Sequence, residues 1–247
     1  MNARELYQAG KLDEAVRTLS TELRDNPADA QRRTFLFELL CFAGDYERAE
    51  KQLEVLGQGS EKPQLGVMLY RAALQAEKTR QELFGKKEYP RASQGDDQSS
   101  TPSGTLNGSS FESFSDADPR IGARLEIFAA GSYLWLPFEQ IASIEMQPPK
   151  RLRDLLWIPA VVRTRSGSKD LDFGEVLLPV LSPLSWKQAD DALRLGRVTD
   201  WKNDESGVLV PVGQKMFVVD GEDFPFLEMR QLEFSEVKRS LNRYASA

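Results

Sequence analysis

A pattern of small and apolar residues occurs twice near the start of this chain. Gly10 stands between two apolar stretches, and Gly44 stands at the same place in a second copy, 34 residues later. The spacing is kept by Leu6 and Leu40, Ala9 and Ala43, Gly10 and Gly44, Ala15 and Ala49, and Leu19 and Leu53. A helical hairpin of this length cannot bury its apolar face alone. The repetition therefore constrains the N-terminal part to a stack of such hairpins.

A period of 34 residues is typical of tetratricopeptide repeats. We expect helices over residues 3–9, 12–24, 28–42 and 45–56, with Asp45 as the N-cap of the last one. A fifth helix, from about Pro63 to Phe84, has an apolar face that would cover the exposed end of the stack. Stacks of this kind serve more often as binding surfaces than as catalysts, which favours a binding protein.

The composition changes after the fifth helix. Residues 91–110 contain one large apolar residue, Leu106, so we expect residues 86–110 to form a flexible linker or loop. From Arg120 onward, apolar and polar residues alternate as in strands. We expect a hairpin over 125–136, strands at 142–146, 160–165, 171–178, 208–210, 215–219 and 226–234, a helix over 185–195 and turns at 166–168 and 196–201.

These patterns predict an α+β fold. Residues 1–85 would form tetratricopeptide-like helical hairpins, residues 86–110 the linker, and residues 111–247 a mostly antiparallel β-rich domain with short helices, ending in a polar tail from residue 235.

The sequence contains no histidine and one cysteine, Cys41. This excludes a histidine-based catalytic triad and a Cys/His zinc site, and Cys41 cannot form a disulfide within the chain. The net charge of −6 disfavours non-specific binding to nucleic acid or membranes. The N-terminus leads directly into an amphipathic helix, without an apolar secretory segment. We therefore expect a cytoplasmic protein with no metal and no other cofactor.

Catalysis would have to rely mainly on carboxylates. The paired candidates are Asp116 with Asp118, Asp190 with Asp191, and Asp220 with Glu222 and Asp223. Two carboxylates in different environments can act as acid and base, so a carboxylate-dependent hydrolase is one alternative. Aspartate is also common in turns and helix caps, and the chain has no Gly-x-x-x-x-Gly-Lys-Ser/Thr phosphate loop. We predict no catalytic residues and no enzymatic activity.

The exposed side of the repeats is the first candidate binding surface. The first helix of each hairpin would line the concave side of the stack with Tyr7, Arg32, Arg33, Phe35 and Glu38. An amphipathic partner helix could place its apolar side there, and the two arginines could pair with its carboxylates. We predict that charge reversal at Arg32 and Arg33 weakens partner binding. The alternative is an ordinary solvated charged face.

A second candidate is the segment that contains Arg151, Arg153, Asp154 and Trp157. A basic loop with an aromatic residue could bind phosphate or nucleic acid. Asp154 neutralises part of this charge, and the whole chain is acidic. We favour a structural loop in which Arg151 or Arg153 pairs with Asp154 and Trp157 enters the core, and we expect no nucleic-acid partner.

Several separated motifs of the second half resemble one known family. They read DADPRIG at 116–122, YLWLPF at 133–138, PPKRLRDLLWIPA at 148–160, ALRLGRVTDW at 192–201 and EMRQLEF at 228–234. In this order they are similar to the ImpE/SciE family, the TagJ-type accessory proteins of bacterial type VI secretion systems. The resemblance covers essentially the whole chain. One departure is the polar stretch at 91–110, which is longer than expected for the family.

The resemblance implies a cytoplasmic, non-enzymatic accessory factor. Such proteins are understood to bind the N-terminal helical part of the small sheath subunit of the secretion tail. Through this contact they are linked to the AAA+ ATPase that recycles contracted sheath. The alternative without the resemblance is a generic repeat adaptor for a different protein partner.

Overall fold

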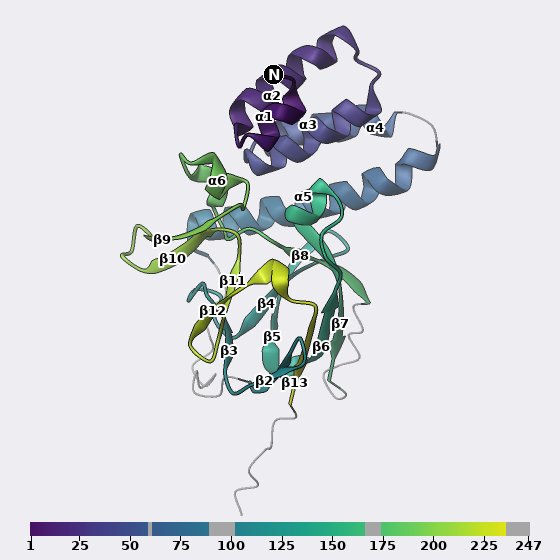
Figure 1. Ribbon diagram of the computed structural model, residues 1–247. Helices are drawn as coiled ribbons and strands as arrows, with labels where there is room; N and C mark the ends of the chain where they lie inside the picture. The colour runs from purple at the N-terminus through teal and green to yellow at the C-terminus, as the bar shows by residue number, and fades with distance from the viewer. Residues whose placement is uncertain (59–60, 89–101, 166–173, 236–247) are drawn as a thin grey trace, which may run out of the picture.

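The computed structural model describes residues 1–58, 61–88, 102–165 and 174–235. The N-terminal part consists of two helical hairpins and a long helix that runs beneath them (Figure 1). The helices are α1 (Ala3–Gln8), α2 (Leu12–Asp25), α3 (Ala30–Phe42), α4 (Tyr46–Gly57) and α5 (Glu61–Lys86). Their order and bounds closely follow the prediction made from the repeated pattern.

Local chemistry explains where these helices begin and turn. At the start of α1, the Asn2 side chain accepts a hydrogen bond from the Glu5 backbone N–H, and the Glu5 carboxylate accepts one from Asn2. Asp45 caps α4 as predicted, because its side chain accepts from the Arg48 N–H. Gly10 and Gly44 have left-handed φ angles of 77° and 72°, which glycine adopts at little cost. The two repeated glycines are therefore the turns of the two hairpins.

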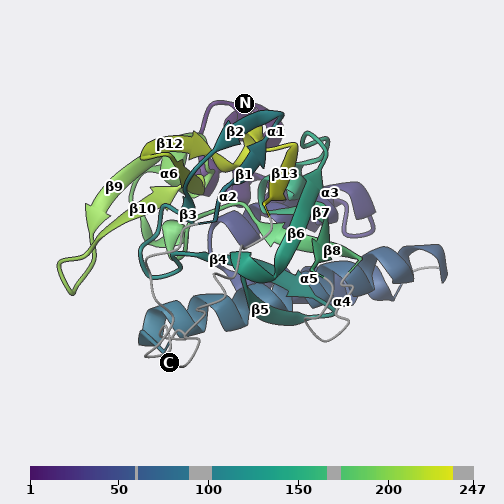
Figure 2. The ribbon, with the colours of Figure 1, turned by 90° about the horizontal axis from the view of Figure 1, so that it is seen from below.

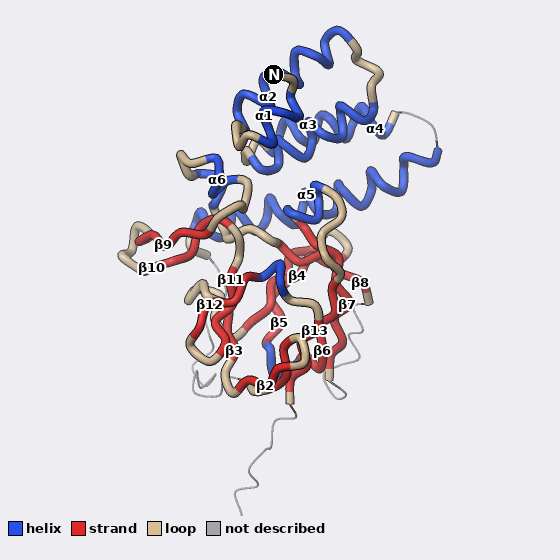
Figure 3. Tube along the Cα trace, in the orientation of Figure 1, coloured by secondary structure: helices blue, strands red, loops and turns tan. Residues whose placement is uncertain are grey.

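Helix α5 packs against other elements on two sides. It covers α4, as predicted for a cap of the repeat stack, and it also lies against strands β4 (Arg124–Ala129) and β5 (Ser132–Pro137) (Figure 3). As a result, the helices and the sheet share one hydrophobic cluster, which includes Phe128. In it the ring centroids of Phe37 of α3 and Trp157 of the β part lie 6.3 Å apart. Helix α5 is thus the middle layer of the molecule.

The β part is built around an eight-stranded sheet in the order β2-β1-β13-β6-β7-β8-β4-β5 (Figure 2). Every pair within it is antiparallel, as predicted. The remaining strands of this sheet are β1 (Gly104–Leu106), β2 (Ser109–Phe111), β6 (Ile141–Met146), β7 (Trp157–Thr164), β8 (Glu175–Pro179) and β13 (Gln231–Phe234).

Two smaller antiparallel sheets complete the described part. One has the order β12-β11-β3, and the other is a hairpin of β9 and β10 that projects from the body (Figure 1). Their strands are β3 (Phe114–Asp116), β9 (Thr199–Asn203), β10 (Leu209–Gly213), β11 (Met216–Val219) and β12 (Glu222–Pro225). Short helices lie between strands: η1 (Phe138–Gln140), η2 (Leu152–Leu155), η3 (Ser185–Lys187), α6 (Asp191–Arg194) and η4 (Phe226–Glu228).

Strand β4 separates two cores. Successive side chains of a strand point to opposite faces. Leu125 and Ile127 accordingly belong to a core within the β part, whereas Phe128 belongs to the cluster under the helices. Glu126 is buried on the same side as Phe128, although it is charged. This alternation places a carboxylate in the interface between the sheet and α5.

The structure corrects several predicted elements. Residues 104–106 in the predicted linker form β1, and residues 109–111 at its end form β2. Strand β1 pairs with β13 and β2 pairs with β1, and Leu106 and Phe111 are buried. The helix predicted over 185–195 is two short helices, the turn predicted at 196–201 contains the start of β9, and the strand predicted at 226–234 begins with a 3-10 turn. Residues 89–101, the turn at 166–168 and the tail from 236 lie outside the described residues.

Candidate partner-binding groove and its supports

A groove of about 720 Å³ runs between α1 and α3. Its α3 wall carries Gln31, Thr34, Phe35 and Glu38, which recur at helical spacing and so share one face. Arg4, Tyr7 and Gln8 form the α1 wall, and Tyr70 of α5 together with Arg151 and Leu152 completes the lining. Side chains from the repeats and from the β part therefore build one surface.

Aromatic rings form the apolar part of the groove. Tyr7 and Phe35 meet edge to face with ring centroids 5.9 Å apart. The Arg4 guanidinium lies 5.9 Å from the centroid of Phe35, and that of Arg197 lies 5.1 Å from the centroid of Tyr7. Both rings are partly exposed. The groove thus offers flat apolar surface bordered by positive charge.

Glu38 is a buried acid in the lining of this groove. The Tyr70 hydroxyl donates a hydrogen bond to its Oε1 at 3.3 Å. Burial raises the pKa of Glu38 to about 7, against the opposing effects of the Tyr70 hydrogen bond and the Arg153 charge. Glu38 can therefore be a neutral hydrogen-bond donor or a carboxylate near neutral pH.

Only three of the five residues predicted for this surface line the groove: Tyr7, Phe35 and Glu38. Arg32 does not line the groove. Its Nε lies 3.4 Å from Glu22 Oε2, and its Nη1 lies 3.5 Å from Asp29 Oδ2. Arg33 donates to Gln52 at 2.7 Å and to the Pro27 carbonyl at 2.5 Å. Neither arginine lines the groove, and both contact neighbouring helices and loops.

The segment around Arg151 has the structural role that the sequence favoured. Asp154 Oδ2 accepts from the backbone N–H groups of Lys150 at 2.8 Å and Arg151 at 2.9 Å, and Arg153 Nε lies 3.6 Å from Asp154 Oδ1. Trp157 is buried, and its Nε1 donates to Glu77 Oε2 at 2.8 Å. The segment also presents Arg151 to the groove. Sequence reasoning treated the two candidate surfaces as separate, but Arg151 belongs to both.

Two arginines of the groove stand out electrostatically. Arg4 and Arg151 are exposed, one on α1 and one on the β part. Among the described residues, neither of them has a carboxylate within ion-pair distance. Their positive charge is therefore available to a partner.

The segment from Trp186 to Arg197 holds the turns of the repeats. Arg197 donates from Nη1 to the Gln8 carbonyl at 2.9 Å and from Nη2 to the Tyr7 carbonyl at 2.5 Å, which satisfies the C-terminal end of α1. Asp191 accepts from the Leu12 N–H at 2.8 Å. Trp186 lies directly over Gly44. Each repeated glycine thus has its own contact from the β part.

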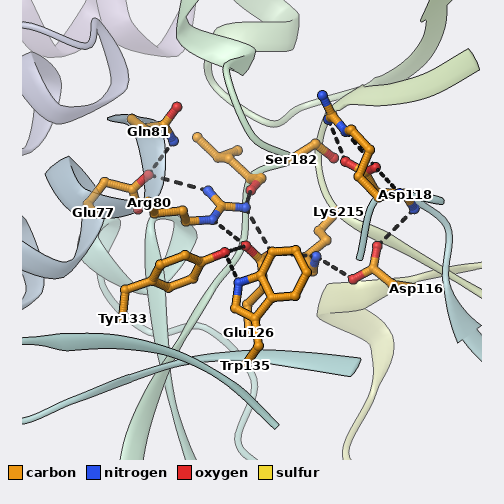
Figure 4. A network of polar contacts seen from close by, with 12 residues as sticks. Glu77, Arg80, Gln81, Asp116, Asp118, Glu126, Tyr133, Trp135, Ser182 and Lys215 are labelled. Atoms are coloured by element: carbon orange, nitrogen blue, oxygen red, sulfur yellow. Dashed lines mark hydrogen bonds and ion pairs between the residues drawn. The ribbon is translucent and has the colours of Figure 1, made fainter. Parts of the chain in front are cut away.

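A buried polar network fixes α5 on the sheet (Figure 4). Arg80 donates from Nε to Glu126 Oε1 at 2.7 Å and from Nη2 to Glu126 Oε2 at 3.0 Å. Lys215 Nζ lies 2.7 Å from Glu126 Oε2 and also pairs with Asp116. The Tyr133 hydroxyl donates to Glu126 Oε1 at 2.6 Å. No feature of the sequence analysis pointed to Arg80 or Lys215.

The charges of this network set the acidity of its members. Burial raises the pKa of Asp116 to about 7, although Lys215 favours its charged form. The adjacent cations Arg80 and Lys215 hold the pKa of Glu126 well below its usual range, against the effect of burial. Glu126 is therefore the permanent anion between two buried cations.

Asp116, Asp118, Asp190 and Asp220, which were considered for a hydrolase, have structural partners. Asp116 pairs with Lys215, and Asp118 binds Arg120 through two hydrogen bonds of 2.8 and 2.5 Å. Asp190 caps α6, and Asp220 accepts from two backbone N–H groups at 2.8 Å. Among the residues that the structure describes, no group of three or more Cys, Asp or Glu side chains could hold a metal ion.

None of the described helices combines the length and the apolar character needed to cross a membrane.

Helical hairpins joined through a shared helix to an antiparallel sheet define a repeat-containing α+β protein. The ImpE protein family matches residues 108–233, and the chain is 32% identical over 264 aligned positions to the type VI secretion system accessory component TagJ of Pseudomonas aeruginosa. That alignment covers 95% of this chain and 91% of the relative. The chain belongs to the ImpE family.

A solved structure has the same fold. The crystal structure of protein VPA1032 from Vibrio parahaemolyticus superposes with a TM-score of 0.82 and 24% identity, and the match covers 96% of this chain and 98% of the other. The predicted order of helical repeats followed by an antiparallel β part is thereby confirmed.

Proposed function

We propose that this protein is a cytoplasmic accessory adaptor of type VI secretion that binds the N-terminal helix of the small sheath subunit in the groove between α1 and α3. Through this contact it would link the sheath to the AAA+ ATPase that recycles it. The accessory role is supported by the relative, which is named an accessory component of the type VI secretion system. The lining of the groove by Arg4, Arg151 and the aromatic rings of Tyr7 and Phe35 supports the rest of the proposal.

An amphipathic helix fits this chemistry. Its apolar side would lie on Tyr7 and Phe35, as in other complexes where a helix occupies a groove. Acidic residues on its flanks would approach Arg4 and Arg151, which lack carboxylate partners among the described side chains. The short wall of two hairpins suits one helix rather than an extended chain.

The experiment is a titration of the full-length protein with a fluorescent peptide that spans the N-terminal helix of the small sheath subunit from the same organism. We expect Arg4→Glu and Arg151→Glu each to weaken binding at least about tenfold, equal to about 1.4 kcal/mol. Arg32→Glu is the matched control, because Arg32 lies outside the groove and already pairs with Glu22 and Asp29. Arg4→Glu and Arg151→Glu should keep the unfolding free energy within about 0.5 kcal/mol, and Arg32→Glu within about 1 kcal/mol, because it loses two exposed ion pairs.

Equal affinity of all variants would defeat the groove as the binding site.

A generic adaptor for another protein is the second candidate, favoured only by the fact that the groove chemistry fits any acidic amphipathic helix. An unrelated acidic amphipathic helix of the same length separates the two. Equal binding of both peptides would favour the generic adaptor.

A further inference from the structure

A second, smaller cavity lies between α5 and the large sheet. Its volume is about 160 Å³, and its apolar lining includes Leu69 and Ala73 of α5 and Phe128, Pro159 and Leu177 of the sheet. An apolar cavity of about 150 Å³ in a protein can hold a benzene molecule. The space therefore suits one aromatic or branched aliphatic side chain.

This cavity and the groove share a wall. Tyr70 lines both of them, and the Arg153 guanidinium, which lines the cavity, lies 5.4 Å from the centroid of the Tyr70 ring. The Tyr70 hydroxyl is bound to Glu38 of the groove at 3.3 Å. A molecule that fills the groove at Tyr70 is therefore next to the cavity.

The surface beside the cavity is also apolar. Leu69, which lines it, is 56% exposed, and the adjacent Met68 is 65% exposed. Exposed large apolar side chains next to an apolar cavity are typical of interaction sites, unlike single scattered ones. In protein interfaces, one aromatic or aliphatic anchor in such a pocket often carries much of the binding energy.

We propose that the partner helix bound in the groove continues past Tyr70 and inserts one large apolar side chain into this cavity. The inference rests on the proposed function, because the groove must be the binding site of that helix. Its occupant is the same sheath-subunit segment, and continuity through Tyr70 and Arg153 is the reason. The recognised sequence is an acidic amphipathic helix flanked by one aromatic or branched aliphatic residue.

The test compares Leu69→Glu with Gln75→Glu in the full-length protein. Leu69 is at the cavity, whereas Gln75 is an exposed position of the same helix that lines neither site. We expect Leu69→Glu to weaken binding of the sheath peptide at least tenfold and Gln75→Glu to leave it unchanged. Replacing the flanking large apolar residue of the peptide by alanine should weaken binding to the wild type, and should remove the difference between wild type and Leu69→Glu.

Other outcomes separate this inference from the proposed function. Normal binding by Leu69→Glu with weak binding by Arg151→Glu would overturn the cavity inference and keep the groove. Normal binding by both variants would overturn the inference together with the groove. Light scattering without peptide tests for self-association. If Leu69→Glu has a lower molecular mass in solution than the wild type, the cavity binds a second copy of the chain and the inference is overturned. An unchanged thermal midpoint of Leu69→Glu excludes misfolding as the cause.

Discussion

Arg80 of α5 and Glu126 of β4 form a two-point ion pair in which the side chains are only 1% and 0% exposed. The pair joins the helical layer to the sheet at the place where the two parts of the molecule meet. Lys215 and Tyr133 bind the same carboxylate, so its oxygens are fully satisfied. A satisfied buried network of this kind defines one arrangement of the helix on the sheet.

We predict that Arg80→Met lowers the free energy of unfolding by about 3–5 kcal/mol, because Glu126 would lose one of its two buried cations and Glu77 would lose its ion-pair partner. Urea denaturation followed by tryptophan fluorescence measures the change. Arg32→Met is the control: its side chain is 42% exposed, so its ion pairs should contribute no more than about 1 kcal/mol. Similar losses for the two variants would contradict the prediction.

The second prediction concerns pH. The pKa of Glu38 is about 7 in the folded protein against 4.5 as its ordinary value, so folding favours its protonated form. The associated stability is fully present below pH 4.5 and is lost as the pH rises through 7. We expect the unfolding free energy to fall between pH 5 and 8, with Glu38 contributing up to about 3 kcal/mol.

Glu38→Gln tests this contribution, because glutamine keeps the shape of the side chain and does not titrate. Urea denaturation at several pH values should give a shallower slope for the variant than for the wild type. Part of the slope should remain, since the pKa of Asp116 is also raised to about 7. An unchanged slope would show that Glu38 does not titrate in this range.

The third prediction compares the two repeated glycines. An added Cβ at Gly44 would lie 2.4 Å from the Trp186 ring, whereas at Gly10 the nearest atom is the flexible end of Arg197 at 3.4 Å. Both have left-handed φ, so alanine costs roughly 1–2 kcal/mol at either position. We expect Gly44→Ala to cost about 1–3 kcal/mol more than Gly10→Ala because of the clash. Thermal unfolding of both variants gives the difference.

A Trp186→Ala background provides the control for this comparison. Without the indole ring, the added cost of Gly44→Ala should disappear and that of Gly10→Ala should stay the same. The same cost of Gly44→Ala in both backgrounds would show that Trp186 does not constrain the second turn.

The helices could be predicted from the sequence because their signals are local. Gly10 and Gly44 mark turns through their own backbone freedom, and Asp45 caps α4 through a contact three residues away. The edge of the sheet was missed for the opposite reason. Residues 104–106 have little apolar character, and only pairing with β13, far along the chain, makes them a strand.

The site was predicted in part. Tyr7, Phe35 and Glu38 follow from their place on the first helix of each hairpin. Arg32 and Arg33 look like them in the sequence, but Glu22, Asp29 and Gln52 engage them in space. Arg80 lies in a charged stretch that resembles an exposed helix face, and only the buried Glu126 opposite makes it a core residue. Such pairings between distant segments have no local signal.

Helix α5 packs against α4 on one side and against β4 and β5 on the other. This packing determines which part of the chain can be exchanged as a unit. A cut after residue 85 would follow the change in composition, but it would remove from the sheet the helix that neutralises Glu126. We expect recombination between relatives to succeed when only the hairpins up to α4 are exchanged and α5 stays with its own sheet. Partner specificity could then diverge in the hairpins while the helix beneath them keeps its original neighbours.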